Sequence, residues 1–131
     1  MENVLQNSAE ILLLIFLVIT FLQSGFDKIF DWKGNLTWLK GHFSSTPLKN
    51  IVPFMLATVL LFEVLAGLLC AIGLYQILFM NGDNLALIGA LLSCLTLLML
   101  LFGQRMAKDY EGAKTIVIYF IPSIFLVFLL Q

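Results

Sequence analysis

Charged side chains are scarce in this chain of 131 residues: they make up 11% of the sequence, against 61% for apolar side chains. In soluble domains about 25% of residues are charged, so this balance excludes an ordinary water-soluble fold. The few charges sum to −1 and are unevenly distributed, and no nucleic-acid partner is expected. Composition therefore indicates an integral membrane protein in contact with lipid, without room for a soluble domain of useful size.

Residues that hold metals and redox groups are almost absent. Cys70 and Cys94 lie in separate apolar runs without a CxxC motif, which excludes a thioredoxin-like site and a zinc site. They are either two packed thiols or a disulfide within the membrane. His42 is the only histidine, so a haem held by two histidines is excluded and a solvated or interfacial side chain is expected. Phosphate loops, HExxH and nucleophile elbows are also missing, so no catalytic residue or metal is predicted and the chain is poorly equipped as a free-standing enzyme.

Four long apolar runs account for most of the sequence. Crossing about 30 Å of hydrocarbon takes roughly 20 helical residues. The first run without charged or amide side chains, Ile11–Leu22, has only 12 residues, so its span must include polar positions as far as Phe30. Short connections make neighbouring spans antiparallel, which predicts an all-α membrane fold with an up-down-up-down four-helix bundle in a single domain, residues 1–131. The predicted spans are residues 9–30, 51–76, 85–103 and 113–130.

Positive charge is missing from three of the five loops and ends of the chain. All seven Lys and Arg residues flank the first and third connections, and the second connection and both termini carry none. Because basic loops of membrane proteins face the cytoplasm, we predict that these two connections are cytoplasmic and that both termini lie outside. The seven residues are Lys28, Lys33, Lys40, Lys49, Arg105, Lys108 and Lys114.

The first connection has a helical pattern of its own over residues 32–43. Its large apolar residues recur at helical spacing, which predicts a short amphipathic helix lying in the membrane interface. Gly34 and Gly41 weaken that prediction, and an irregular loop with interfacial aromatic residues is the alternative. Trp32 and Trp38 are candidate docking residues for a partner. The stripe consists of Trp32, Leu36, Leu39 and Phe43.

Small and polar residues predict how the spans pack, because membrane helices associate through close backbone approach and interhelical hydrogen bonds. Each span carries one such face. On the second span the face is Glu63, Ala66, Gly67, Cys70 and Gly73, and on the third it is Ala86, Gly89, Ser93, Thr96 and Gly103. On the first it is Thr20, Gln23, Ser24 and Asp27, and on the fourth Thr115, Tyr119 and Pro122.

Glu63 interrupts the second apolar run, where a carboxylate costs several kcal/mol unless it is protonated, paired or facing protein. It lies 12 residues beyond Ile51, about 18 Å along a helix. Other polar residues are expected at neighbouring depths in the cytoplasmic half of the bundle. Glu63 is then either a proton carrier or partner of a bound polar headgroup, or a structural carboxylate that fixes helix register. The predicted cluster is Gln23, Asp27, Lys28, Glu63, Arg105 and Tyr119.

The third connection carries a second group of polar residues. Arg105 and Asp109 are four positions apart and would pair on one helical face, with Tyr110 at the level of the interface. This stretch is either a charged helix end with a tight turn at Gly112, or a docking surface for a partner or a lipid headgroup. Asp109 and Tyr110 are the candidate docking residues.

Several of these stretches resemble the DoxX family. The sequence FLQSGFDKI at residues 21–29 is similar to the end of that family's first span. Glu63 followed by Gly67 and Gly73 resembles its second span, and residues 103–113 resemble a stretch found in bacterial members. The likeness extends over nearly the whole chain.

The resemblance implies a small bacterial inner-membrane protein with a four-helix fold. It also implies a link to membrane redox assemblies, because the family takes its name from a subunit of a thiosulfate–quinone oxidoreductase. The missing redox cysteine pairs argue against autonomous electron transfer. The resemblance points to six polar positions without giving any of them a catalytic role: Gln23, Asp27, Lys28, Glu63, Arg105 and Asp109.

These observations support two functional hypotheses. The leading one is a non-catalytic accessory subunit that packs against other integral subunits of a larger membrane complex, respiratory or redox in kind, or against copies of itself. The alternative is a quinone- or lipid-binding component of a membrane oxidoreductase that uses the Glu63 cluster directly, with quinone as its cofactor. A small transporter is less favoured, because inverted repeats and broken midplane helices are not evident.

Overall fold

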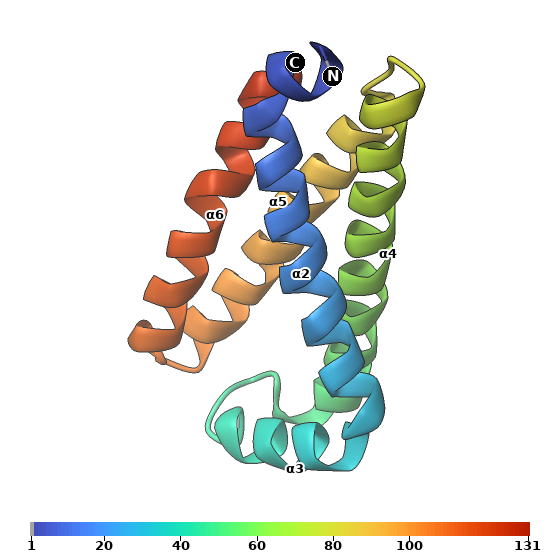
Figure 1. Cartoon of the computed structure of the whole chain (residues 1–131). Coiled ribbons are helices and arrows are strands. Elements are labelled where there is room, and N and C mark those ends of the chain that lie inside the picture. The colour runs from blue at the N-terminus through green and yellow to red at the C-terminus, as the bar shows by residue number, and fades with distance from the viewer. Residues whose placement is uncertain (1) are drawn as a thin grey trace.

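The computed structural model describes residues 2–131, with side chains from Val4 onward, and contains helices and turns but no strand in that range. Met1, the first residue of the predicted domain, lies outside the described residues. The helices follow one another along the chain as shown in Figure 1. They are α1 (Glu2–Gln6), α2 (Ser8–Phe30), α3 (Trp32–His42), the 3-10 turn η1 (Lys49–Ile51), α4 (Val52–Phe79), α5 (Asn84–Met106) and α6 (Tyr110–Leu130).

Four of these helices, α2, α4, α5 and α6, are long and apolar enough to cross a membrane, which confirms the all-α fold with four spans. Three spans extend several residues beyond their predicted ends. The second continues to Phe79, the third runs from Asn84 to Met106, and the fourth begins at Tyr110. Polar residues such as Gln76 and Gln104 continue a helix as readily as leucine does. A helix can therefore extend beyond the last residue of the apolar run that predicts it.

The four long helices run in alternating directions between two ends of the molecule (Figure 1). α4 packs against both α2 and α5, and α6 packs chiefly against α5. α2 and α6 meet at the end that carries both termini and diverge toward the opposite end, where α3 lies (Figure 1). The two connections that carry all the Lys and Arg residues are at that opposite end.

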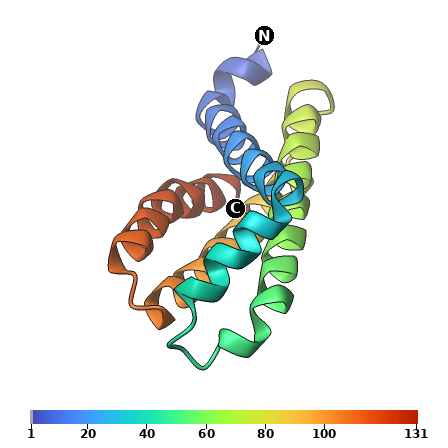
Figure 2. The same cartoon turned by 90° about the horizontal axis from the view of Figure 1, so that it is seen from below.

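The helix predicted over residues 32–43 is present as α3. Figure 2 shows it lying across the end of the bundle. The Asp31 side chain begins the helix by accepting a hydrogen bond from the backbone N–H of Gly34 at 3.2 Å. The predicted apolar stripe is its more buried face, whereas Lys33, Thr37 and Lys40 are exposed. The position of α3 in a membrane interface stays a prediction.

The packing faces predicted for the second and third spans are confirmed. A Cβ on Gly73 of α4 would lie 2.5 Å from the Cα of Ala86 on α5, and one on Gly89 would lie 2.9 Å from the backbone nitrogen of Cys70. Such close approach is possible only between small residues. Of the two faces, Gly103 is half-buried and the others are all buried: Glu63, Ala66, Gly67, Cys70, Gly73, Ala86, Gly89, Ser93 and Thr96.

The packing faces predicted for the first and fourth spans are wrong. Gln23, Asp27 and Thr115 are exposed, and the other residues of these two faces are half-buried. α2 and α6 bury chiefly apolar side chains, because α2 packs mainly against α4 and α6 mainly against α5, which turns other faces of the two helices inward. The buried residues are Ile11, Leu14, Leu17, Phe21 and Gly25 on α2, and Ala113, Ser123, Leu126, Val127 and Leu130 on α6.

Arg105 and Asp109 do not form the predicted pair. α5 ends at Met106 and Lys108 has a positive φ of 59°, so the two residues do not share a helix. Asp109 instead caps α6, because its side chain accepts a hydrogen bond from the backbone N–H of Gly112 at 2.9 Å. The Arg105 guanidinium lies over the ring of Tyr110, 5.4 Å from its centroid.

Candidate intramembrane site around Glu63

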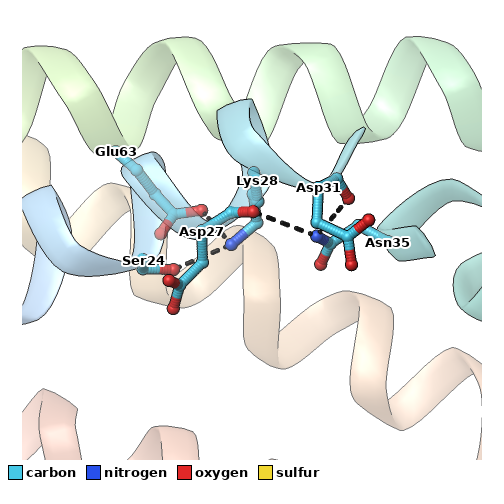
Figure 3. Close-up of polar contacts among 6 residues, drawn as sticks. All are labelled: Ser24, Asp27, Lys28, Asp31, Asn35 and Glu63. Atoms are coloured by element: carbon cyan, nitrogen blue, oxygen red, sulfur yellow. Dashed lines mark hydrogen bonds and ion pairs between the residues drawn. The ribbon is translucent and has the colours of Figure 1, made fainter. Parts of the chain in front are cut away.

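Glu63 lies near the middle of α4 and only 1% of its surface is exposed. Its Oε1 lies 2.8 Å from the Nζ of Lys28, close to the end of α2. Figure 3 shows the Lys28 ammonium between this carboxylate and the hydroxyl of Ser24, to which it donates a hydrogen bond of 2.8 Å. A buried carboxylate within a span needs such a partner. Lys28 therefore explains how α4 accommodates Glu63.

Helix geometry brings these groups together. Ser24 and Lys28 are four residues apart on α2, so they share a face of that helix. Gly25 lets α4 approach this part of α2, since a Cβ there would lie 3.1 Å from Cγ2 of Val64. The aliphatic stem of Lys28 then carries the ammonium to the carboxylate.

The ion pair leaves the carboxylate incompletely satisfied. The Lys28 ammonium occupies Oε1 at 2.8 Å, but the second carboxylate oxygen, Oε2, accepts no hydrogen bond from the described residues. Glu63 therefore has the capacity to accept a hydrogen bond from a bound molecule.

A cavity of about 330 Å³ adjoins Glu63, and we call it the Glu63 cavity. Residues of all four long helices form its wall, in the half of the bundle where α2 and α6 diverge. Leucine, isoleucine and phenylalanine side chains alternate with polar groups, a composition typical of small-molecule sites. The polar residues of the wall are Thr20, Gln23, Ser24, Asp27, Glu63 and Tyr119.

The structure brings together most of the predicted cluster. Gln23, Asp27, Glu63 and Tyr119 line the Glu63 cavity, and Lys28 pairs with Glu63. The Asp27 carboxylate has no ion pair or hydrogen bond with any described residue, and Figure 3 draws none. Arg105 is not at this site, because it is exposed and lies over Tyr110. Similar depth in the bundle does not bring two residues together unless they also point the same way around their helices.

One polar contact was not evident from the sequence. His42 Nε2 lies 2.9 Å from Oε1 of Gln104 and 3.6 Å from Oδ2 of Asp109, and the His42 ring stacks on Trp38 with centroids 4.5 Å apart. His42 is therefore half-buried and bonded rather than solvated, and it ties α3 to the end of α5. His42 and Gln104 are 62 positions apart in the chain, so no local pattern reveals this contact.

The predicted docking residues differ in exposure. Trp38 and Tyr110 are exposed, whereas Trp32 and Asp109 are half-buried. Their part in docking stays a prediction. Cys70 and Cys94 are separate buried thiols, so the disulfide alternative is set aside. Among the described residues, no group of three or more His, Cys, Asp and Glu side chains is placed to hold a metal ion.

A comparison with known protein families gives a match over most of the chain. The model of the DoxX family matches residues 11–105, a stretch that includes Lys28, Glu63 and α3. No curated protein and no solved structure matches the chain.

Proposed function

Since the chain belongs to the DoxX family and is a multi-pass membrane protein, we propose that it binds the headgroup of a quinone in the Glu63 cavity. In this role it serves as a component of a membrane redox assembly and not as a complete enzyme. The observation that carries the proposal is the cavity of about 330 Å³, whose wall includes the buried carboxylate of Glu63.

The polar groups of the wall match both redox forms of such a headgroup. A quinone ring presents two carbonyl oxygens that accept hydrogen bonds, which the Tyr119 hydroxyl and the Gln23 amide can donate. The reduced quinol presents hydroxyls that donate, and the Glu63 carboxylate can accept them. The apolar part of the wall suits the ring faces, while the isoprenoid tail remains in lipid.

Charge favours a neutral headgroup over an acidic one. Asp27 and Glu63 both contribute carboxylates to the wall of the Glu63 cavity, and no lysine or arginine is among the described residues that line it. A phosphate would meet two carboxylates there, and like charges at close range oppose binding. Quinones and quinols carry no charge and avoid this repulsion.

A substitution that fills the cavity without touching the ion pair tests the proposal. Thr20→Leu places a larger side chain in the wall, and Thr115→Leu is the matched control, because Thr115 is exposed on α6 and lies outside the wall. The probe is a short-chain ubiquinone, titrated calorimetrically into detergent-purified protein. We expect Thr20→Leu to weaken binding by about tenfold or more and Thr115→Leu to leave it unchanged. Equal binding by both variants and the wild type would contradict the proposal.

A conservative change then tests Glu63 itself. Glu63→Gln keeps the size and one acceptor oxygen of the side chain but removes its charge. We expect this variant to fold and to bind the reduced quinol about tenfold more weakly, since hydrogen bonds to charged groups are the stronger ones. A variant that fails to fold would instead assign Glu63 a structural role.

That structural role is the second candidate, a non-catalytic accessory subunit of a larger membrane redox complex. It is favoured by the contact with Lys28, which pairs the buried carboxylate without any ligand. Under this proposal the pair fixes α2 against α4, and outward-facing helix surfaces bind other subunits. Purification in mild detergent distinguishes it, because a protein that runs alone as a monomer, without co-purifying membrane subunits, would contradict it.

We further propose a place in the bacterial inner membrane, with the end of the bundle that carries α3 in the cytoplasm. The position of all Lys and Arg residues at that end supports this orientation. Single cysteines at two exposed positions, Ser45→Cys and Asp83→Cys, test it in intact cells with a membrane-impermeant thiol reagent. We expect the reagent to label position 83 alone. Labelling at position 45 alone would show that the protein has the opposite orientation.

A further inference from the structure

A second cavity lies at the end of the bundle that α3 crosses, on the Lys28 side of the ion pair. We call it the α3 cavity, and its volume is about 240 Å³. Residues of α3 form one wall, and the first turns of α4 and the last turns of α5 form the others. Most of the lining is apolar, including Trp38, Phe43, Met55 and Met99, while Lys28 supplies its one cation among the described residues.

We infer that the α3 cavity binds an anionic phospholipid, with the acidic headgroup at Lys28 and the upper part of one acyl chain among the apolar side chains. This site is separate from the Glu63 cavity and does not depend on quinone binding. Lys28 lines the α3 cavity and Glu63 lines the Glu63 cavity, so the two members of one ion pair offer ligands different charges.

The ammonium of Lys28 has a donor to spare. It carries three N–H groups, and its two contacts are with Glu63 Oε1 and Ser24 Oγ, both at 2.8 Å. The Lys28 side chain is 17% exposed, compared with 2% for Glu63. No carboxylate is among the described residues that line the α3 cavity, so Lys28 is the charged group that an acidic ligand meets in its wall.

Two other polar side chains of the wall, Asn35 and His42, already make hydrogen bonds. Asn35 donates to the backbone carbonyls of Asp27 and Asp31, at 3.4 and 2.8 Å, and His42 is bonded to Gln104. Lys28 is thus the group that positions the headgroup. Exposed lysines on the same connection add positive charge around this end of the bundle, which favours an acidic lipid further: Lys33, Lys40 and Lys49.

The size of the cavity fits part of a lipid rather than a whole small molecule. Sites for drug-sized ligands occupy roughly 300–1,000 Å³, more than the α3 cavity offers. A phospholipid needs less enclosed space, because only its headgroup linkage and the first part of one chain must enter while the rest stays in the bilayer. Methionine side chains suit such a flexible chain, since they adapt to irregular surfaces.

Retention of two lipids by the wild-type protein gives the first test. The protein is purified in mild detergent, incubated with phosphatidylglycerol or phosphatidylcholine, and examined by native mass spectrometry. We expect about tenfold higher retention of phosphatidylglycerol, in keeping with a hydrogen bond to a charged group. Equal retention of both lipids would overturn the inference.

A pair of glycine variants locates the site. Leucine at Gly103 enters the α3 cavity, because a Cβ there would make only ordinary contact, 3.5 Å from Cζ of Phe43. The matched control is Gly41→Leu on α3, where a Cβ would meet nothing within 4 Å and the residue lies outside the cavity wall. We expect Gly103→Leu to reduce retention of phosphatidylglycerol by about tenfold and Gly41→Leu to leave it unchanged. If Gly103→Leu retains phosphatidylglycerol as well as the wild type does, the lipid does not bind in the α3 cavity.

Binding of short-chain ubiquinone to Gly103→Leu separates this inference from the proposed function. Gly103 does not line the Glu63 cavity, so the variant is expected to bind the quinone as the wild type does. Loss of both ligands would contradict two separate sites. The double variant Lys28→Met/Glu63→Met removes both charges together and avoids stranding either one. It is expected to lose the preference for phosphatidylglycerol over phosphatidylcholine, and a preserved preference would exclude Lys28 as the headgroup contact.

Discussion

The interface of α4 with α5 and the side of the bundle between α2 and α6 are built on different principles. On α4 and α5, glycine, alanine and serine bring two backbones close enough that an added methyl group at Gly73 would collide with the Cα of Ala86. Between α2 and α6, large side chains cover a longer distance, and the helices diverge around the Glu63 cavity. The first interface is shaped by close packing, whereas the second region holds a cavity beside the ion pair that joins α2 to α4.

This difference assigns separate tasks to the two regions. Close packing offers few alternative arrangements, so α4 and α5 form a stable framework on which the other helices rest. The region around α2 and α6 keeps polar groups and open space in the same place, as binding requires. Substitutions that act on one region and not on the other should therefore separate stability from binding.

The largest loss of stability is expected from Lys28→Met. Removing the ammonium leaves Glu63 buried without its cation, which costs about 3–5 kcal/mol of unfolding free energy. Reversible unfolding in mixed micelles measures the loss. Lys28→Met/Glu63→Met should recover most of it, because replacing both members of a buried pair is often nearly neutral. A double variant as unstable as the single one would show that α2 does not depend on the pair.

Gly73→Ala should have the next largest effect. The new Cβ would lie 2.5 Å from both the Cα and the backbone nitrogen of Ala86, so α4 and α5 must move apart. Overpacking of this kind costs about 1–3 kcal/mol. The same unfolding measurement applies, with Gly41→Ala as control because its Cβ meets nothing within 4 Å. Stability equal to that of the wild type would mean that the α4–α5 interface is not closely packed.

Gly25→Ala tests the same kind of change where α2 contacts α4, next to Ser24 in the wall of the Glu63 cavity. Its Cβ would meet the Cγ2 of Val64 at 3.1 Å, and a side chain can yield where a backbone cannot. We expect a change of less than about 1 kcal/mol in unfolding free energy, well below that of Gly73→Ala. If Gly25→Ala is the more destabilising of the two, the contrast between the regions is reversed.

Gln23→Ala should have the smallest effect on stability and still reveal the site. Gln23 is exposed on α2 and lines the Glu63 cavity, so we expect stability within about 0.5 kcal/mol of the wild type. Binding of short-chain ubiquinone should weaken by several-fold, since one donor is lost, as calorimetry would measure. A variant that binds normally would remove Gln23 from the headgroup site.

The sequence predicted those features that depend on periodicity along a single helix. The four spans, the helix at residues 32–43 and the packing face around Gly67 and Gly73 all follow from apolar or small residues at helical spacing. The packing face of α2 was predicted wrongly, because the rule for small and polar residues assumes close helices. Polar residues on α2 line a cavity instead.

The site itself could be predicted only in part. A buried carboxylate requires a partner, and depth along the spans named both Lys28 and Arg105 as cations that could provide it. The choice between them depends on the rotation of each helix about its axis and on where α5 ends, which only the tertiary structure determines. The bond of His42 to Gln104 was missed for the same reason, since it joins elements far apart in the chain.

The ion pair also has a consequence for biosynthesis. Lys28 belongs to the first span and Glu63 to the second, so the cation has already left the ribosome when the carboxylate enters the translocon. Glu63 can meet its counter-charge as soon as α4 inserts, before α5 and α6 enter the membrane. The charge that is most costly to place in lipid is thus neutralised by the earliest helical hairpin.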